Sequence, residues 1–171
     1  MTSSHLFSAA AALALMAAPA LAQSPDYSVG SGTLYASVKG WSIAKSEQYG
    51  CSAYLDAMQI VINAPPAGGW QLIFPYDGAD GEFQGSIDVD KYSFTETYFG
   101  EAGWMYSSFP LGMRQAVGAG SMIHPMIGPV DEEIALTGST AAMLKVEECW
   151  KELSGWTPAS SRAGTFAFSG D

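Results

Sequence analysis

Carboxylates gather in one part of the sequence, in residue types that could bind a metal ion. Five of them lie between residues 77 and 90: Asp77, Asp80, Glu82, Asp88 and Asp90. Calcium prefers several oxygen ligands in a flexible loop, but the spacing of Asp77 and Asp80 does not follow the EF-hand series. An Asp-Gly turn at Asp80 explains part of the cluster without a metal. The sequence therefore requires no cofactor and leaves calcium as an alternative.

Two of these carboxylates, Asp88 and Asp90, could also take part in acid–base catalysis. Residues two apart on a strand share one face, with about 7 Å between them. The carboxyl pair of a glycosidase is separated by roughly 5–9.5 Å. Any acidic pair with this spacing meets that condition, and a solvated strand face explains the pair without catalysis. A hydrolase that uses these carboxylates is the third functional hypothesis.

Nucleophilic catalysis would depend on His124, the single histidine after residue 22. A Ser-His-acid triad would place Ser121 or Ser139 beside it, but no G-x-S-x-G motif is present. The neighbours of His124 are mostly apolar, which favours a structural histidine. The sequence therefore assigns no catalytic residue and indicates a non-enzymatic protein.

Aromatic side chains form two rows at strand spacing. Trp104 and Tyr106 share one strand face, and Tyr92, Phe94 and Tyr98 share another. Exposed rows of this kind stack on sugar rings or act as hot spots for protein binding. Buried rows are instead core or cross-strand packing. An exposed row is the hypothesis for a ligand-binding site, and burial is its alternative.

The elements that position these residues are short and separated by turn formers, as in antiparallel β proteins. The expected strands cover residues 33–43 (one or two strands), 49–55, 58–63, 70–74, 83–89, 91–99, 103–107, 121–127 and 133–137.

Two helices complete the expected fold. A short helix is predicted near residues 110–118 and a C-terminal helix near residues 140–153. The turn-forming residues 75–81 predict a hairpin between the strands 70–74 and 83–89. The fold class is mainly β: an antiparallel β-sandwich or barrel-like domain with these two helices.

The first 22 residues have the pattern of a cleaved signal peptide, an apolar run followed by Ala20-Leu21-Ala22. We expect a flexible tether over residues 23–32, a single β-rich domain over residues 33–155, and a tail or edge strand over residues 156–171. The apolar run is too short for a stable membrane anchor. A periplasmic or secreted protein is therefore expected.

The predicted C-terminal helix has a defined start and one apolar face. Ser139 or Thr140 has the chemistry to cap its N-terminus, which interprets Ser139 as structural. Cys149 lies on the apolar face, from which it can reach Cys51. An even number of cysteines in an oxidising compartment predicts a Cys51–Cys149 disulfide, with two buried thiols as the alternative.

The chain is acidic, with 17 Asp and Glu residues against 7 Lys and Arg residues and a formal net charge of −10. Its basic residues are scattered singly and cannot form a stripe for phosphates, so nucleic acid is excluded as a partner. The same charge repels an anionic membrane surface.

Short motifs spread over residues 40–150 give the sequence a family resemblance. They are Gly40-Trp41-Ser42, Gly50-Cys51, the MRQAVGAG stretch at 113–120, Leu136-Thr137-Gly138-Ser139, Ala141-Ala142 and Cys149. In these motifs the chain resembles the invasion-associated locus B-like proteins, which are exported proteobacterial proteins. The resemblance implies a periplasmic or secreted β-rich protein associated with host contact or envelope function. It implies no enzyme activity and no site residues.

The sequence thus supports three hypotheses from different classes. The first is a non-enzymatic exported envelope protein that binds a protein partner. The second is a carbohydrate- or small-ligand-binding β-sandwich with an aromatic platform, with or without calcium. The third is the hydrolase with paired carboxylates.

Overall fold

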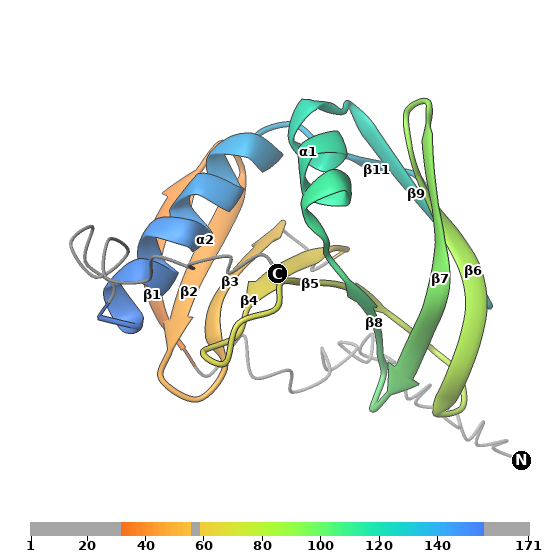
Figure 1. Cartoon of the computed structure of the whole chain (residues 1–171), viewed down its shortest axis with the longest axis horizontal. Helices are drawn as coiled ribbons and strands as arrows, with labels where there is room; N and C mark the ends of the chain where they lie inside the picture. The colour runs from red at the N-terminus through yellow and green to blue at the C-terminus, as the bar shows by residue number, and fades with distance from the viewer. Residues whose placement is uncertain (1–31, 56–58, 156–171) are drawn as a thin grey trace, which may run out of the picture.

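A computed structural model describes residues 32–55 and 59–155 (Figure 1). The expected signal peptide, most of the tether and the tail lie outside these residues. Eleven strands form one sheet, and all their pairings are antiparallel. The strands are β1 (Thr33–Val38), β2 (Trp41–Ser46), β3 (Gly50–Leu55), β4 (Val61–Ala64), β5 (Gln71–Pro75), β6 (Gly81–Val89), β7 (Tyr92–Glu101), β8 (Trp104–Ser108), β9 (Met122–Ile127), β10 (Val130–Asp131) and β11 (Ile134–Ala135). The predicted fold class is confirmed, with an open sheet in place of a closed barrel.

The strand order is β1-β2-β3-β4-β5-β8-β7-β6-β9-β10, with β11 also paired to β9. The predicted hairpin between residues 70–74 and 83–89 is therefore wrong. β5 pairs with β4 and β8, whereas β6 pairs with β7 and β9. Left-handed turns at Asp90 (φ 49°) and Ala102 (φ 51°) fold the chain back twice, so that β8 lies between β5 and β7. Turn chemistry shows where the chain bends but does not choose the partner strand.

The sheet curves strongly, and its concave side holds the core and both helices (Figure 1). α2 (Ser139–Leu153) packs across β1 to β4, while α1 (Leu111–Ala119) lies between that part of the sheet and the part made of β6, β7 and β9. Strand alternation directs Ile43, Ala53 and Ile62 toward the helices, and all three are fully buried. The two predicted helices are confirmed, each within one residue of its expected bounds at either end.

The predicted disulfide is present and fixes α2 to the sheet. Cys51 of β3 and Cys149 of α2 are bonded, with their Cα atoms 6.0 Å apart and a sequence separation of 98. Two indole N–H groups hold the same helix near its ends. Trp41 Nε1 donates to the carbonyl of Thr137 at 3.0 Å, and Trp150 Nε1 donates to the carbonyl of Pro65 at 3.0 Å. The start of the helix and its C-terminal part, where Cys149 and Trp150 are adjacent, are thus tied to strands or their loops.

The start of α2 differs from its prediction, because neither Ser139 nor Thr140 caps it. The N-cap is Gly138, in a left-handed conformation (φ 85°) and without a side-chain cap. The Ser139 hydroxyl instead donates to the carbonyl of Val117 at 2.8 Å, and the Thr140 hydroxyl donates to the carbonyl of Gly118. These carbonyls belong to the last turn of α1, where they have no intrahelical partner. The two hydroxyls therefore join the end of α1 to the start of α2.

Removing the disulfide should destabilise the protein strongly. We expect the double substitution Cys51→Ala with Cys149→Ala to lower the free energy of unfolding by about 4–5 kcal/mol, because the oxidised chain closes a long loop in the unfolded state. Urea denaturation of both proteins measures this difference. Wild type reduced with dithiothreitol should unfold at the same urea concentration as the double variant. A urea midpoint equal to that of oxidised wild type, in both the reduced protein and the double variant, would contradict the stabilising role of the disulfide.

Candidate functional site

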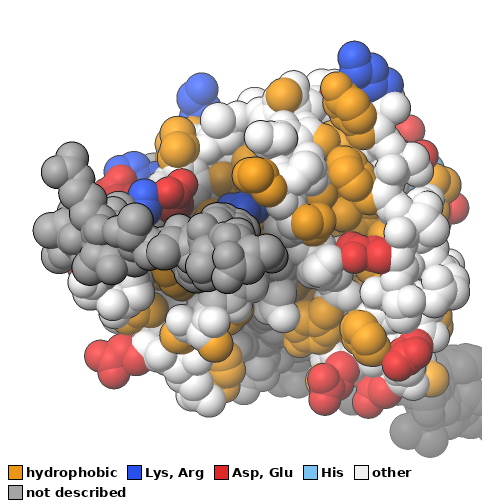
Figure 2. Space-filling model, in the orientation of Figure 1, with side chains coloured by type: hydrophobic (Ala, Val, Ile, Leu, Met, Phe, Trp, Pro, Cys, Tyr) orange, Lys and Arg blue, Asp and Glu red, His pale blue; other side chains and the backbone are white. Residues whose placement is uncertain are grey.

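A groove runs between α1 and α2 on the surface of the protein. We call it the α1–α2 groove, and its volume is about 420 Å³. Figure 2 shows hydrophobic side chains gathered over α1 and beside it. The residues that line the groove are Trp70, Arg114, Gln115, Gly118, Ala119, Thr140, Met143, Leu144 and Glu147.

The helices form this groove because each buries one face and exposes long apolar side chains on another. α1 buries Met113, Ala116 and Val117, and its Leu111 is 61% exposed. On α2, Leu144 lines the groove and is also 61% exposed. Large aliphatic side chains at this exposure on two adjacent helices form an apolar surface, a feature that often marks an interaction site in soluble proteins.

Arg114 is the cation of the groove. The central carbon of its guanidinium lies 4.9 Å from the centroid of the Trp70 ring, in a cation–π arrangement. Its Nε is buried and has no hydrogen-bond partner among the described residues. A buried donor without an acceptor costs free energy, and the cost is larger for a charged group. Arg114 is therefore held on an aromatic surface with a donor unused.

One carboxylate, Glu147, lines the same groove, and it is paired with another residue. Glu147 lies within 2.5 Å of Lys151 Nζ, as an i,i+4 ion pair along α2. No ion pair to Arg114 is found within residues 32–55 and 59–155. The groove consequently presents an apolar lining with one uncompensated positive charge, although the whole chain is strongly acidic.

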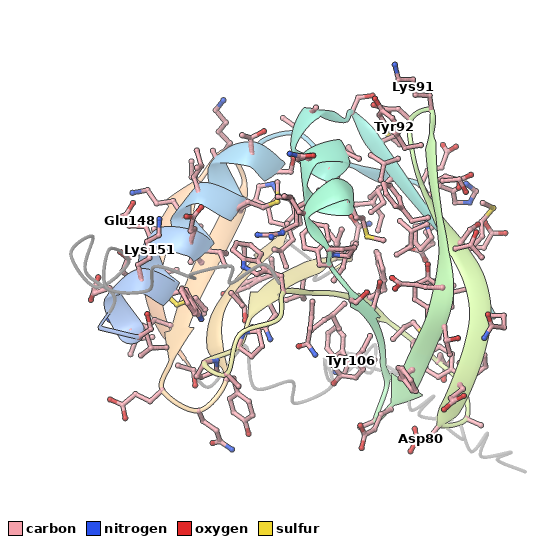
Figure 3. The ribbon with its side chains drawn as sticks, in the orientation of Figure 1. Asp80, Lys91, Tyr92, Tyr106, Glu148 and Lys151 are labelled. Carbon is pink, nitrogen blue, oxygen red and sulfur yellow. A yellow bond between two sulfur atoms is a disulfide. The ribbon has the colours of Figure 1, made fainter. Side chains whose placement is uncertain are left out.

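Neither predicted aromatic row forms an exposed platform. Trp104 is only 3% exposed and packs in a small cluster with buried residues of neighbouring strands. Tyr98 is fully buried and Phe94 packs against the main core. Tyr92 is 52% exposed, but it lies at the tip of the β6–β7 hairpin, far from Tyr106 on β8 (Figure 3). The rows therefore serve mainly as packing, which is the alternative given above.

Several surface residues of interest were not predicted from the sequence. Phe99 is 51% exposed on the outer face of β7, directly opposite Tyr106 of β8. The alternation of the strand was a signal for Phe99. Phe99 directly follows the inward-facing Tyr98, so its side chain must face outward. Arg114 and Leu144 gave no signal, because their meeting depends on how two helices distant in sequence pack together.

The five acidic residues do not form one cluster. Asp80 precedes β6 and Asp90 follows it, and Figure 3 shows Asp80 and the Lys91 turn at opposite ends of the hairpin. A strand of nine residues spans about 30 Å, so the five carboxylates cannot converge on one ion. In the part of the chain that the structure describes, no group of three or more His, Cys, Asp or Glu side chains is arranged to hold a metal. Calcium binding therefore stays a prediction, and these five carboxylates do not form a site for it.

Individual acidic side chains have local structural tasks. Asp80 Oδ1 accepts the Ala102 N–H at 3.0 Å, which ties together the loops at that end of the sheet. Asp90 accepts the hydroxyl and N–H of Ser121 at 2.8 and 3.0 Å and the N–H of Met122 at 3.1 Å. These hydrogen bonds, that from the Ser121 hydroxyl first, hold the pKa of Asp90 below its ordinary value. Asp90 therefore anchors the start of β9.

The components of a serine hydrolase are not assembled. The Ser121 hydroxyl is bound to Asp90, whereas His124 Nε2 lies 2.6 Å from Asp131 Oδ1. Ser139 is 2% exposed and donates to a helix carbonyl. Each candidate group thus has a separate partner.

The paired carboxylates are also separated in role. Asp88 lies on β6 with a buried Oδ1 that has no hydrogen-bond partner among the described residues, while Asp90 sits in a left-handed turn. The sequence pattern predicted that Asp88 and Asp90 share one strand face. In the structure they do not.

The fold is an open antiparallel sheet with two helices on its concave side. Among solved structures, the chain is similar to the crystal structure of invasion associated protein B from Bartonella henselae, at 16% sequence identity and a TM-score of 0.49, over 70% of this chain and 99% of that chain. No family model and no curated protein matches the chain. Of the helices described, neither is long and apolar enough to cross a membrane.

Loss of the Asp90 carboxylate should destabilise the protein in a pH-dependent way. Because the pKa of Asp90 is lowered in the folded state, its contribution is fully present above the ordinary pKa of 3.8 and is lost as the pH falls through the lower, folded value. We expect Asp90→Asn to melt several degrees below wild type at pH 7, with a difference that shrinks below about pH 4. Thermal melts from pH 2 to pH 7 measure this trend.

The matched control is Asp77→Asn, which also removes one negative charge but breaks no hydrogen bond within the described residues. A difference between Asp90→Asn and wild type that stays constant down to pH 2 would contradict the anchoring role of the ionised carboxylate.

Proposed function

We propose that this protein is a non-enzymatic, exported binding module of the cell envelope or of host contact, and that its α1–α2 groove receives a segment of a protein partner. The observation that carries the proposal is the Arg114 guanidinium, whose central carbon lies 4.9 Å from the Trp70 ring centroid in the apolar groove, with no ion pair among the described residues. A carboxylate of a ligand in the groove would pair with this charge.

The chemistry of the groove suggests the kind of segment that fits. Trp70, Met143 and Leu144 offer apolar and aromatic contact area, and Trp and Arg are the residue types that most often dominate binding energy at interfaces. Arg114 supplies positive charge where the rest of the chain is acidic. A carboxylate accepting from a guanidinium forms one of the stronger hydrogen bonds available to proteins. The occupant is therefore an apolar peptide segment that carries an acidic side chain.

Two features support placement outside the cytoplasm. The Cys51–Cys149 disulfide joins distant parts of the chain, and such bonds persist in oxidising compartments. The N-terminal 22 residues have the composition of a signal peptide. Both fit the envelope or host-contact role that the sequence resemblance implies.

Substitution of Arg114 should separate binding from stability. Arg114→Leu keeps apolar contact with Trp70 and removes the unsatisfied donor, so we expect a melting temperature equal to or above that of wild type. Binding of acidic, apolar peptides should weaken at least tenfold, which corresponds to about 1.4 kcal/mol. The probes are peptides selected against the folded protein from a random phage-displayed library, with affinities measured by fluorescence polarisation.

Lys91→Leu is the matched control, because Lys91 also lies over an aromatic ring, that of Tyr92 at 5.3 Å, and is remote from the groove. It should bind the selected peptides as wild type does. Selection of peptides without acidic residues, or equal binding by Arg114→Leu, would refute the groove as the partner site. A large loss of stability in Arg114→Leu would instead identify Arg114 as a structural residue.

A further inference from the structure

A second groove lies on the outer face of the sheet, where β7 separates from β8. The two strands pair from Glu101↔Trp104 to Phe99↔Tyr106 and no further. Beyond that point β7 continues beside β6 only, while β8 continues beside β5 as far as Gln71↔Ser108. The fork leaves a groove of about 400 Å³, which we call the β7–β8 groove. It is lined by Pro65, Gly68, Gly69, Trp70, Gln71, Thr97, Phe99, Tyr106, Ser107 and Ser108.

Aromatic rings form part of its wall. Phe99 and Tyr106 are direct cross-strand partners on the same face, and Phe99 is 51% exposed. Trp70 contributes from the loop on the far side of the groove. An aromatic face that solvent can reach offers a flat apolar surface to the C–H groups of a sugar ring. The sequence analysis did not predict this pair. Phe99 belongs to neither predicted aromatic row, and it lies beside Tyr106 only because β7 pairs with β8.

Polar groups beside the rings are held in place by their own hydrogen bonds. Ser52 donates to Asn63 Oδ1 at 2.8 Å, and Asn63 Nδ2 donates to Gln71 Oε1 at 3.1 Å. This chain crosses three strands and occupies the carbonyl oxygen of Gln71, which orients its amide. The Gln71 Nε2 group then remains as a donor at the groove, with no hydrogen bond to it among the described residues.

An acceptor lies at the fork as well. Glu96 accepts the hydroxyls of Ser107 and Ser108 at 2.7 and 2.6 Å. Both serines line the groove, whereas Glu96 does not and shares a strand face with the buried Tyr98. Each serine oxygen can still accept a hydrogen bond. Sugar hydroxyls donate and accept at once, so a site with a fixed amide donor and two fixed serine oxygens suits them better than it suits a purely apolar ligand.

We propose that the β7–β8 groove binds a neutral sugar unit of an oligosaccharide, stacked on Phe99 and Tyr106 and hydrogen-bonded by Gln71, Ser107 and Ser108. No Lys or Arg lines the groove, and the chain carries a net charge of −10, which disfavours anionic sugars. This site goes beyond the proposed protein-binding function and uses different residues, apart from Trp70.

Titration with defined neutral oligosaccharides tests the site. The probes are cellotetraose, chitotetraose and maltotetraose, with an alginate tetrasaccharide as the anionic comparison. Binding to the full chain, purified with its disulfide intact, is measured by calorimetry and by saturation-transfer NMR. We expect at least one neutral tetrasaccharide to bind and the alginate fragment not to bind. Absence of binding by all three neutral probes, or binding of the anionic probe alone, would overturn the proposal.

Variants locate the sugar within the protein. Phe99→Ala should weaken binding about tenfold through loss of the stacking surface. Gln71→Glu keeps an acceptor for Asn63 but removes the amide donor, and should also weaken binding. Tyr92→Ala is the matched control, because Tyr92 is 52% exposed on the same strand and outside the groove. Equal affinity of Phe99→Ala and Tyr92→Ala would place the sugar elsewhere and refute the site.

The two grooves can fail independently. Arg114→Leu should retain full sugar binding, and Phe99→Ala should retain binding of the acidic peptides. Loss of both ligands in either variant, with the melting temperature unchanged, would contradict the assignment of the two grooves to two ligands.

Discussion

The attachment of α2 to the sheet is the interaction on which the rest of the structure depends. The Cys51–Cys149 bond fixes the C-terminal part of the helix to β3, and the indole N–H donors of Trp41 and Trp150 tie its start and that same C-terminal part. An open sheet has no closing strand pair to hold its curvature, so something must span its concave side. α2 does so for β1 to β4, and its first residues then reach the end of α1.

This attachment also determines where the α1–α2 groove lies. Because Ser139 and Thr140 bind carbonyls of α1 rather than capping their own helix, the two helices meet at a fixed point and diverge from it. The groove that opens between them is a consequence of that joint. The β7–β8 groove has a similar origin, since β8 pairs with β5 and β7 only where the curvature allows both. Both sites lie where a regular pairing ends.

The sequence predicted what local chemistry controls and missed what depends on distant contacts. Both helices, most strands and the disulfide followed from periodicity, turn residues and the cysteine count, which are local or compositional signals. The partner of β5 did not, because the whole β6–β7 hairpin separates β8 from β5 in the sequence. Tyr98 and Phe99 show the same limit at the level of one residue. Alternation separates the two onto opposite faces, but only the curvature of the finished sheet decides which face is covered.

Hydrogen-bond satisfaction distinguishes the α1–α2 groove from much of the described structure. The donors around Asp90, for example, form a closed arrangement. Two buried side-chain atoms stand apart, Asp88 Oδ1 and Arg114 Nε. Asp88 lies within the β6 pairing, opposite Ser93 and His124, and lines none of the grooves described above. Arg114 lines the α1–α2 groove beside the exposed Leu144, and the proposed ligand would pair with its guanidinium there. The same imbalance is thus a local cost of the sheet in one case and part of a proposed recognition site in the other.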